Sequence, residues 1–293
     1  MDQIPSYVFA LASSFLFALG DQFQTLGLQH GMGRRAGATL NIAASAICFW
    51  LLAPWFLDAS LFTHPAVLWF ILIGLIRPAL SANLAVAGIH HLGPTLAGTL
   101  SGITPMFVAA FGIFWLGEVL TWPVAVGTTG IILAIVMLAS GGRRAAVSWP
   151  VWALLFPLGA AAVRSASHAV TKVGMLEIPD PYFAALVAFT VSAFLTLGAE
   201  QFSPKASRVT LLGSGAKWFF LAGVVFAVSV LSLNNALIRG DIITVVPIIA
   251  AAPVFTMLMS WLIFRREKIT ARTLAALALV LPSVILIVVL GHR

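Results

Sequence analysis

Four ionisable side chains, Asp21, Arg77, Arg164 and His168, interrupt long apolar runs of this 293-residue sequence. Only 9% of the residues are charged and 61% are hydrophobic, so charges inside the apolar runs are exceptions. A carboxylate can accept hydrogen bonds from an ammonium group, and a guanidinium can donate a pair of them to a carboxylate. Histidine can change its protonation state near neutral pH. Together these side chains have the chemistry to bind an amino acid and to couple its binding to protons.

Helical periodicity places further polar side chains beside these four. Asp21 shares a helix face with Ser14, Phe17 and Gln24, because the four residues recur every three or four positions. The same spacing is found in two other apolar runs, one with Gly74, Arg77, Ser81 and Gly88, the other with Arg164, His168 and Thr171. The candidate substrate-binding residues are therefore Asp21, Gln24, Arg77, Ser81, Asn83, Arg164, His168 and Asn234.

These residues have expected roles and open alternatives. We expect Asp21 to accept from the substrate ammonium and either Arg164 or Arg77 to donate to its carboxylate. His168 and Asp21 are the candidates for proton coupling. Alternatively, Asp21 and Arg164 could form a structural ion pair. His168 could be a buried histidine with satisfied hydrogen bonds, and Asn234 could join two helices.

Four prolines inside apolar runs mark expected helix breaks: Pro78, Pro105, Pro247 and Pro253. Proline has no N–H and disrupts the helix around it. Interrupted helices at corresponding positions of a transporter point to its binding site and gates. We therefore expect these four positions to act in gating.

The elements that must position these residues are apolar segments. A membrane-spanning helix needs about 20 mainly apolar residues. Ten segments meet this requirement: 5–28, 37–57, 66–89, 94–116, 121–140, 149–173, 181–202, 217–238, 242–264 and 269–290. Soluble domains carry about 25% charged residues. The composition therefore excludes a cytosolic enzyme, a secreted disulfide scaffold and a disordered chain, and it predicts an all-α integral membrane protein of about ten transmembrane helices.

Basic residues are concentrated in alternate loops. The loops after the first, fifth, seventh and ninth segments hold Arg34, Arg35, Arg143, Arg144, Lys205, Arg208, Lys217, Arg265, Arg266, Lys268 and Arg272, whereas the other side holds Lys172, Arg239 and Arg293. The positive-inside rule then places those loops in the cytoplasm and both termini outside a bacterial-type inner membrane. The basic doublets form no long stripe, so nucleic acid is not an expected partner.

The two halves of the chain resemble each other. Gly93, Pro105 and Thr121 of the first half are followed, in the same order and at nearly constant intervals, by Gly240, Pro253 and Thr270. Five segments per repeat is an odd number, so the second copy must be inverted in the membrane. We expect one repeat over residues 1–142 and the other over 143–293, with a substrate site between them.

The run from Leu92 to Pro105, followed by Leu116-Gly117-Glu118-Val119-Leu120-Thr121, resembles the EamA-type repeat of the drug/metabolite transporter superfamily. Within the superfamily the chain looks most like the YddG-type amino-acid exporters, whose substrates include aromatic amino acids. Lys172 fits a lysine position of the family, whereas Gly27 stands at the corresponding place in the first repeat. The resemblance implies cytoplasmic termini, the opposite of the orientation that the basic residues predict.

We expect a secondary transporter that exports small metabolites, amino acids including aromatic ones, by alternating access through a central cavity. A multidrug or other metabolite exporter of the same superfamily is the main alternative, followed by a channel and by an intramembrane enzyme. No catalytic or nucleotide-binding motif is present, so no enzymatic activity is expected. The single Cys48 excludes an intramolecular disulfide. The expected partners are an amino-acid substrate and the lipid bilayer, the protein acts as a monomer, and no cofactor or metal is expected.

Overall fold

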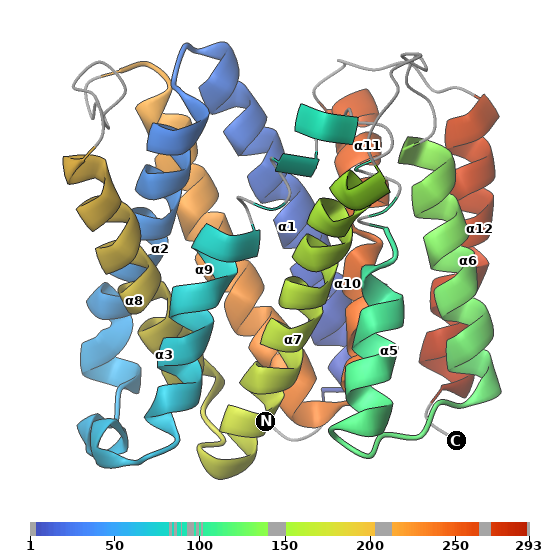
Figure 1. The fold of residues 1–293 in the computed structure, drawn as a ribbon, viewed down its shortest axis with the longest axis horizontal. Helices are drawn as coiled ribbons and strands as arrows, with labels where there is room; N and C mark the ends of the chain where they lie inside the picture. The colour runs from blue at the N-terminus through green and yellow to red at the C-terminus, as the bar shows by residue number, and fades with distance from the viewer. Residues whose placement is uncertain are drawn as a thin grey trace.

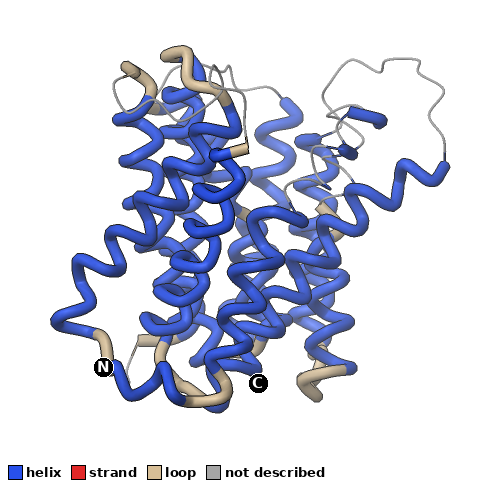
Figure 2. The backbone as a smooth tube through the Cα atoms, turned by 60° about the vertical axis from the view of Figure 1, so that its left-hand side comes forward, coloured by secondary structure: helices blue, strands red, loops and turns tan. Residues whose placement is uncertain are grey.

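The computed structural model describes residues 4–81, 84, 87–88, 90–92, 97, 100, 102–139, 151–202, 213–263 and 271–291. Within these ranges the chain forms helices and no strand, as Figure 2 shows. The helices stand side by side along one common direction (Figure 1). Helix α1 begins and α12 ends at the same end of this bundle.

The helices follow one another through short connections. Their bounds are α1 (Ser6–Gln29), α2 (Arg34–Phe56), α3 (Val67–Ile76), α5 (Thr104–Phe114), α6 (Trp122–Ala139), α7 (Leu155–Glu177), α8 (Pro181–Gln201), α9 (Ala216–Arg239), α10 (Ile242–Ala250), α11 (Ala252–Leu262) and α12 (Ala271–Leu290). Short 3-10 helices form at η1 (Ala59–Thr63) and η3 (Val151–Leu154), and η2 (Arg77–Ser81) is a π-helix.

Five helices of the described chain are long and apolar enough to cross a membrane: α2, α7 together with η3, α8, α9, and α10 together with α11. Shorter apolar helices lie within α3, α5, α6 and α12. The spans predicted at 37–57, 181–202 and 217–238 agree with α2, α8 and α9 to within three residues. Runs of some 20 residues are long enough for this, because each helical residue advances about 1.5 Å across a bilayer core of about 30 Å.

Prolines lie where the helices are interrupted. The span predicted at 242–264 forms two helices, α10 and α11, which meet at Ala251, and Pro253 lies in the first turn of α11. Pro105 lies in the first turn of α5 in the same way. The first turn tolerates proline because its N–H groups have no partner within the helix. Pro247, in contrast, lies inside α10, so it does not end that helix.

The packing of the helices follows an inverted twofold pattern. Helices α1, α2, α3, α5 and α6 correspond in order to α7, α8, α9, α11 and α12. Helix α1 packs against α9 as α7 packs against α3, and α5 packs against α7 as α11 packs against α1. Helices α2 and α8 contact each other, and so do α6 and α12. Because α1 and α7 run in opposite directions through the bundle, the two halves are inverted copies (Figure 1).

Two serine–glycine contacts fix the register of this symmetry. The Ser45 hydroxyl of α2 donates to the Gly223 carbonyl of α9 at 2.7 Å, and the Ser192 hydroxyl of α8 donates to the Gly74 carbonyl of α3 at 3.0 Å. A Cβ atom on either glycine would lie within 3.0 Å of a backbone oxygen of the facing helix. The two serines thus occupy equivalent positions of α2 and α8, and the two glycines occupy equivalent positions of α3 and α9.

The register of α1 and α7 follows from a second pair of contacts. Gly27 of α1 lies against the Phe219 ring of α9, and Gly174 of α7 lies against the Phe70 ring of α3. Phe219 precedes Gly223 by one helical turn, as Phe70 precedes Gly74, so both sets of contacts agree on the register of α3 and α9. Gly27 and Gly174 are therefore equivalent positions. They align α1 with α7 residue by residue, which the sequence alone left ambiguous by about two positions.

Candidate functional site

A cavity of about 360 Å³ lies between the two repeats. This volume is in the range of about 300–1,000 Å³ that is typical of sites for small organic molecules. The cavity is lined by Phe17, Gln24, Asn41, Ile42, Ile73, Arg77, Ser81, Arg164, Ala188, Phe189, Ser192, Phe226 and Val230. Gln24 lies near the end of α1 and Asn41 near the start of α2, so the cavity extends from the middle of the bundle towards its upper end in Figure 1.

Arg77 and Arg164 are the two charged residues of the described cavity lining. Arg77 opens the π-helix η2, and Arg164 lies near the middle of α7. Their positive charges are close enough to interact with each other. The ion pairs found in the described part of the chain join other residues, Arg35 to Glu200 and Lys172 to its partners. Both guanidinium groups thus retain donors for a ligand.

Aromatic side chains form another part of the cavity wall. The rings of Phe17 from α1 and Phe226 from α9 have centroids 5.7 Å apart. Phe189 of α8 also lines the cavity and stacks on Phe49, with ring centroids 5.6 Å apart. Aromatic faces pack well against apolar or aromatic ligand groups. The cavity can therefore hold a molecule that combines an acidic group with an apolar one.

The inverted symmetry relates the aromatic wall to the arginine wall. In the register of the glycine contacts, Phe17 of α1 corresponds to Arg164 of α7. Arg77 follows Gly74 by three positions, as Phe226 follows Gly223, so these two residues correspond as well. The contact between the two rings in one half thus has its counterpart in the approach of the two guanidinium groups in the other. One backbone arrangement, used twice, presents two phenylalanines in one place and two arginines in the other.

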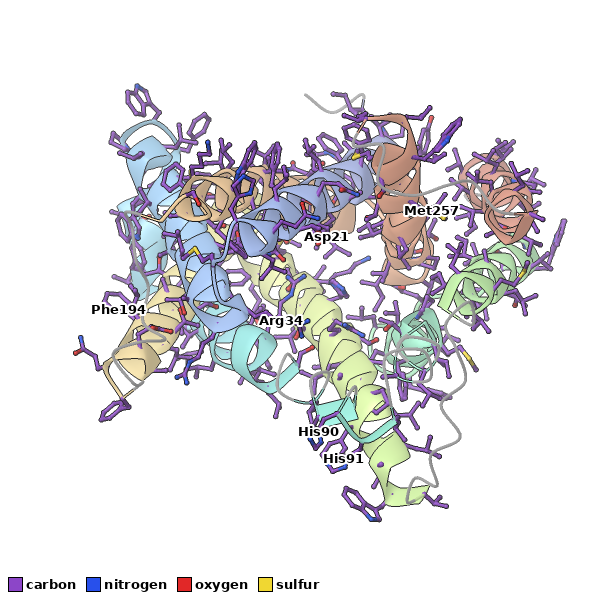
Figure 3. The ribbon with its side chains drawn as sticks, turned by 90° about the horizontal axis from the view of Figure 1, so that it is seen from above. Asp21, Arg34, His90, His91, Phe194 and Met257 are labelled. Carbon is purple, nitrogen blue, oxygen red and sulfur yellow. The ribbon has the colours of Figure 1, made fainter. Side chains whose placement is uncertain are left out.

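Four of the predicted binding residues line this cavity: Gln24, Arg77, Ser81 and Arg164. Three others lie elsewhere in the described structure. Asp21 is exposed on α1, in the interior of the bundle when seen from above, whereas Phe194 is at the periphery (Figure 3). His168 is 8% exposed, one helical turn beyond Arg164 and near the charges of both arginines.

Asn234 lies outside the cavity lining. It is 3% exposed, and its side-chain amide donates to the Pro181 carbonyl of α8 at 3.1 Å, so it joins α9 to the start of α8. Asn83 and the side chain of Pro78 lie outside the described residues. The alternative ion pair between Asp21 and Arg164 is not among the ion pairs of the described chain.

Sequence reasoning missed four polar or aromatic residues of the cavity: Asn41, Phe189, Ser192 and Phe226. Asn41 had a usable signal, since an amide inside an apolar span requires a partner. Its Oδ1 atom is buried and forms no hydrogen bond in the described structure. The two phenylalanines had none, because phenylalanine is abundant in this sequence and its position relative to the cavity depends on helix packing.

A charged cluster joins the repeats at the opposite end of the bundle. The Lys172 ammonium of α7 contacts the Glu118 carboxylate at 3.0 Å and Asp241 at 3.4 Å, and it donates to the Gly240 carbonyl at 2.7 Å. Glu118 also accepts from the first two N–H groups of α10, at 2.8 and 3.0 Å. The helix dipole favours a carboxylate there. The cluster thus ties the end of α5 to α7 and to the α9–α10 connection.

Comparison with known proteins gives one family and one fold. The model of the EamA-like transporter family matches the chain twice, over residues 4–140 and 151–289. A crystal structure of a protein that is 16% identical has the same fold, with a TM-score of 0.81 over 98% of both chains. No curated protein matches the chain. The double match agrees with the inverted repeats seen in the helix packing.

Proposed function

The chain belongs to the EamA-like transporter family, and from this premise we propose that it exports small metabolites, amino acids including aromatic ones among them, by alternating access. It is an all-α integral membrane protein with two inverted repeats of five spans, the architecture of secondary transporters. The observation that carries the proposal is the cavity between the repeats, in which two arginines face three phenylalanines. Such a site matches a carboxylate joined to an apolar side chain.

Alternating access follows from the difference between the two ends of the bundle. The cavity extends towards one end, whereas the Lys172–Glu118–Asp241 cluster joins the repeats at the other. Opening the second end requires these contacts to separate. Inverted repeats provide such a motion, because an exchange of conformations between the two copies closes one end as it opens the other.

The basic residues set the proposed orientation. Arg34, Arg35 and Lys217 lie at the end towards which the cavity extends (Figure 1). The positive-inside rule places this end in the cytoplasm of a bacterial-type inner membrane and both termini outside. In this orientation the cavity takes up its substrate from inside the cell, as an exporter must. We further propose that the protein acts as a monomer, because the cavity is built within one chain.

Asp21 and His168 are the proposed proton-coupling pair. Asp21 precedes Gly27 by six positions, as His168 precedes Gly174, so the two residues correspond in α1 and α7. Both side chains can carry or release a proton. His168 lies near Arg77 and Arg164, so its protonation would respond to an anion that binds between them. Transport with and without a pH gradient distinguishes proton exchange from uniport.

The experiment is efflux of radiolabelled Phe, Thr and Met from proteoliposomes that contain the purified protein. We expect efflux above that of protein-free liposomes, and faster efflux when a pH gradient is imposed. Arg164→Gln should reduce the initial rate at least tenfold, whereas Arg239→Gln, which removes a positive charge at a helix end outside the cavity, should not. The substrate class is wrong if none of the three amino acids moves, and equal rates with and without the gradient contradict proton coupling.

A further inference from the structure

We infer that the cavity selects substrates with a net negative charge, so that N-acylated or 2-oxo relatives of amino acids bind in preference to the free zwitterions. This inference rests on the proposed function and narrows its substrate class. It comes from one juxtaposition in a cavity of about 360 Å³: two neighbouring arginines, with no carboxylate partner among the described residues, opposite two phenylalanines.

The charges of the described cavity lining are both positive. Arg77 and Arg164 repel each other at close range, and this repulsion is stronger in an apolar surrounding than in water. Removing charges from water without a partner is unfavourable. A bound anion offsets both effects because it accepts hydrogen bonds from both guanidinium groups. A zwitterion brings a carboxylate and an ammonium group, and its positive charge opposes this gain.

A zwitterion would need a carboxylate in the cavity to receive its ammonium group. Asp21 is exposed on α1 and does not belong to the described cavity lining. Glu118, Glu200 and Asp241 are ion-paired elsewhere, with Lys172 or Arg35. The polar groups that remain in the lining are neutral: the amides of Gln24 and Asn41 and the hydroxyls of Ser81 and Ser192.

The unpartnered amide of Asn41 fits a neutral nitrogen-containing group. Its Oδ1 atom is buried and has no hydrogen-bond partner among the described residues, so it is an acceptor for a ligand N–H. An N-acyl amide offers one N–H and no positive charge. An acylated amino acid would thus bind its carboxylate to the arginines, its N–H to Asn41 and its side chain to Phe17 and Phe226.

The test is a series of ligands that share a phenyl group and differ in charge. The probes are 2-phenylethylamine, phenylalanine, 3-phenylpropionate and N-acetylphenylalanine, titrated calorimetrically into the full-length protein in nanodiscs at pH 7. Removal of the ammonium group from phenylalanine gives 3-phenylpropionate, so this pair isolates the charge. We expect both anions to bind about tenfold or more tightly than phenylalanine, and phenylethylamine to show no binding.

Variants assign the preference to the arginines. Arg77→Gln and Arg164→Gln should each bring the affinity ratio of 3-phenylpropionate to phenylalanine close to one, whereas Arg164→Lys and the control Arg239→Gln should keep it. Asp21→Asn should leave the ratio unchanged. If phenylalanine binds as tightly as 3-phenylpropionate in the wild-type protein, the inference is wrong while the proposed function stands. If no compound of the series binds, the proposed substrate class fails as well.

Discussion

At corresponding positions, the first repeat places Phe17 in the cavity where the second places Arg164, and the second places Phe226 where the first places Arg77. The backbones around these residues are related by serine–glycine and glycine–phenylalanine contacts that occur once in each copy. The helix scaffold is therefore symmetric, whereas the surface offered to a substrate is not. Close helix packing is retained in both copies, and the side chains at the cavity have diverged into an apolar wall and a cationic one.

The largest expected effect comes from making the two walls alike. Arg164→Phe gives α7 the residue that α1 carries at the corresponding position, so the scaffold should accept the ring. We expect the initial rate of anion transport to fall about 100-fold, since hydrogen bonds to charged groups each contribute about 1.5–3 kcal/mol. The measurement is counterflow of N-acetylphenylalanine in proteoliposomes. Unchanged counterflow in a monodisperse, thermally stable variant would show that the arginine wall is not used.

The shared scaffold is tested through its glycines. Gly74→Ala and Gly223→Ala should each lower the free energy of unfolding by about 1–3 kcal/mol, because the new Cβ atom has no room against the facing backbone oxygen. The two losses should be similar if the contacts are truly related by symmetry. Denaturant unfolding in detergent micelles, followed by tryptophan fluorescence, measures both.

Gly198 of α8 provides the matched control for these variants. A Cβ atom there meets no atom within 4 Å, so Gly198→Ala should be neutral or stabilising by up to about 1 kcal/mol, as alanine favours a helix over glycine. A loss at Gly74 with none at Gly223 would contradict the symmetry. Equal losses at all three glycines would show that packing space is not the cause.

The smallest expected effect concerns the apolar wall. Phe17→Ala and Phe226→Ala should each raise the KM of an aromatic substrate about fivefold to tenfold, since an aromatic contact contributes about 0.5–1.5 kcal/mol. The KM of a substrate without a ring, such as N-acetylalanine, should change less. Phe194→Ala is the control, because this ring is 74% exposed at the bundle periphery. An equal increase for both substrates would indicate a general packing defect instead.

Much of the fold was predictable from the sequence, because the length of an apolar run sets the length of a helix. The span at 181–202 forms α8 over Pro181–Gln201, and Pro253 begins a helix as its sequence position indicates. The interruption of the span at 66–89 by a π-helix was only partly foreseen. Pro78 indicated a disturbance there but not its kind.

The candidate site was predictable only within each helix. Periodicity placed Gln24 and Arg164 on faces that do line the cavity. It could not select Phe226, because the side of α9 that meets α1 is decided by contacts between the two repeats. The register between the copies was also beyond the sequence. Lys172 corresponds to Thr25 in the register of the glycine contacts, and not to Gly27, where the family's lysine position had been placed.

The most direct test of two unlike walls is the position of a labelled ligand. A crystal structure with 3-(4-bromophenyl)propionate, recorded at the bromine absorption edge, locates the ring end of the ligand independently of its carboxylate. We expect the anomalous peak beside Phe17 and Phe226, with the carboxylate density between Arg77 and Arg164. A bromine peak beside the arginines, or ligand density outside the cavity between the repeats, would contradict the site proposed for this transporter.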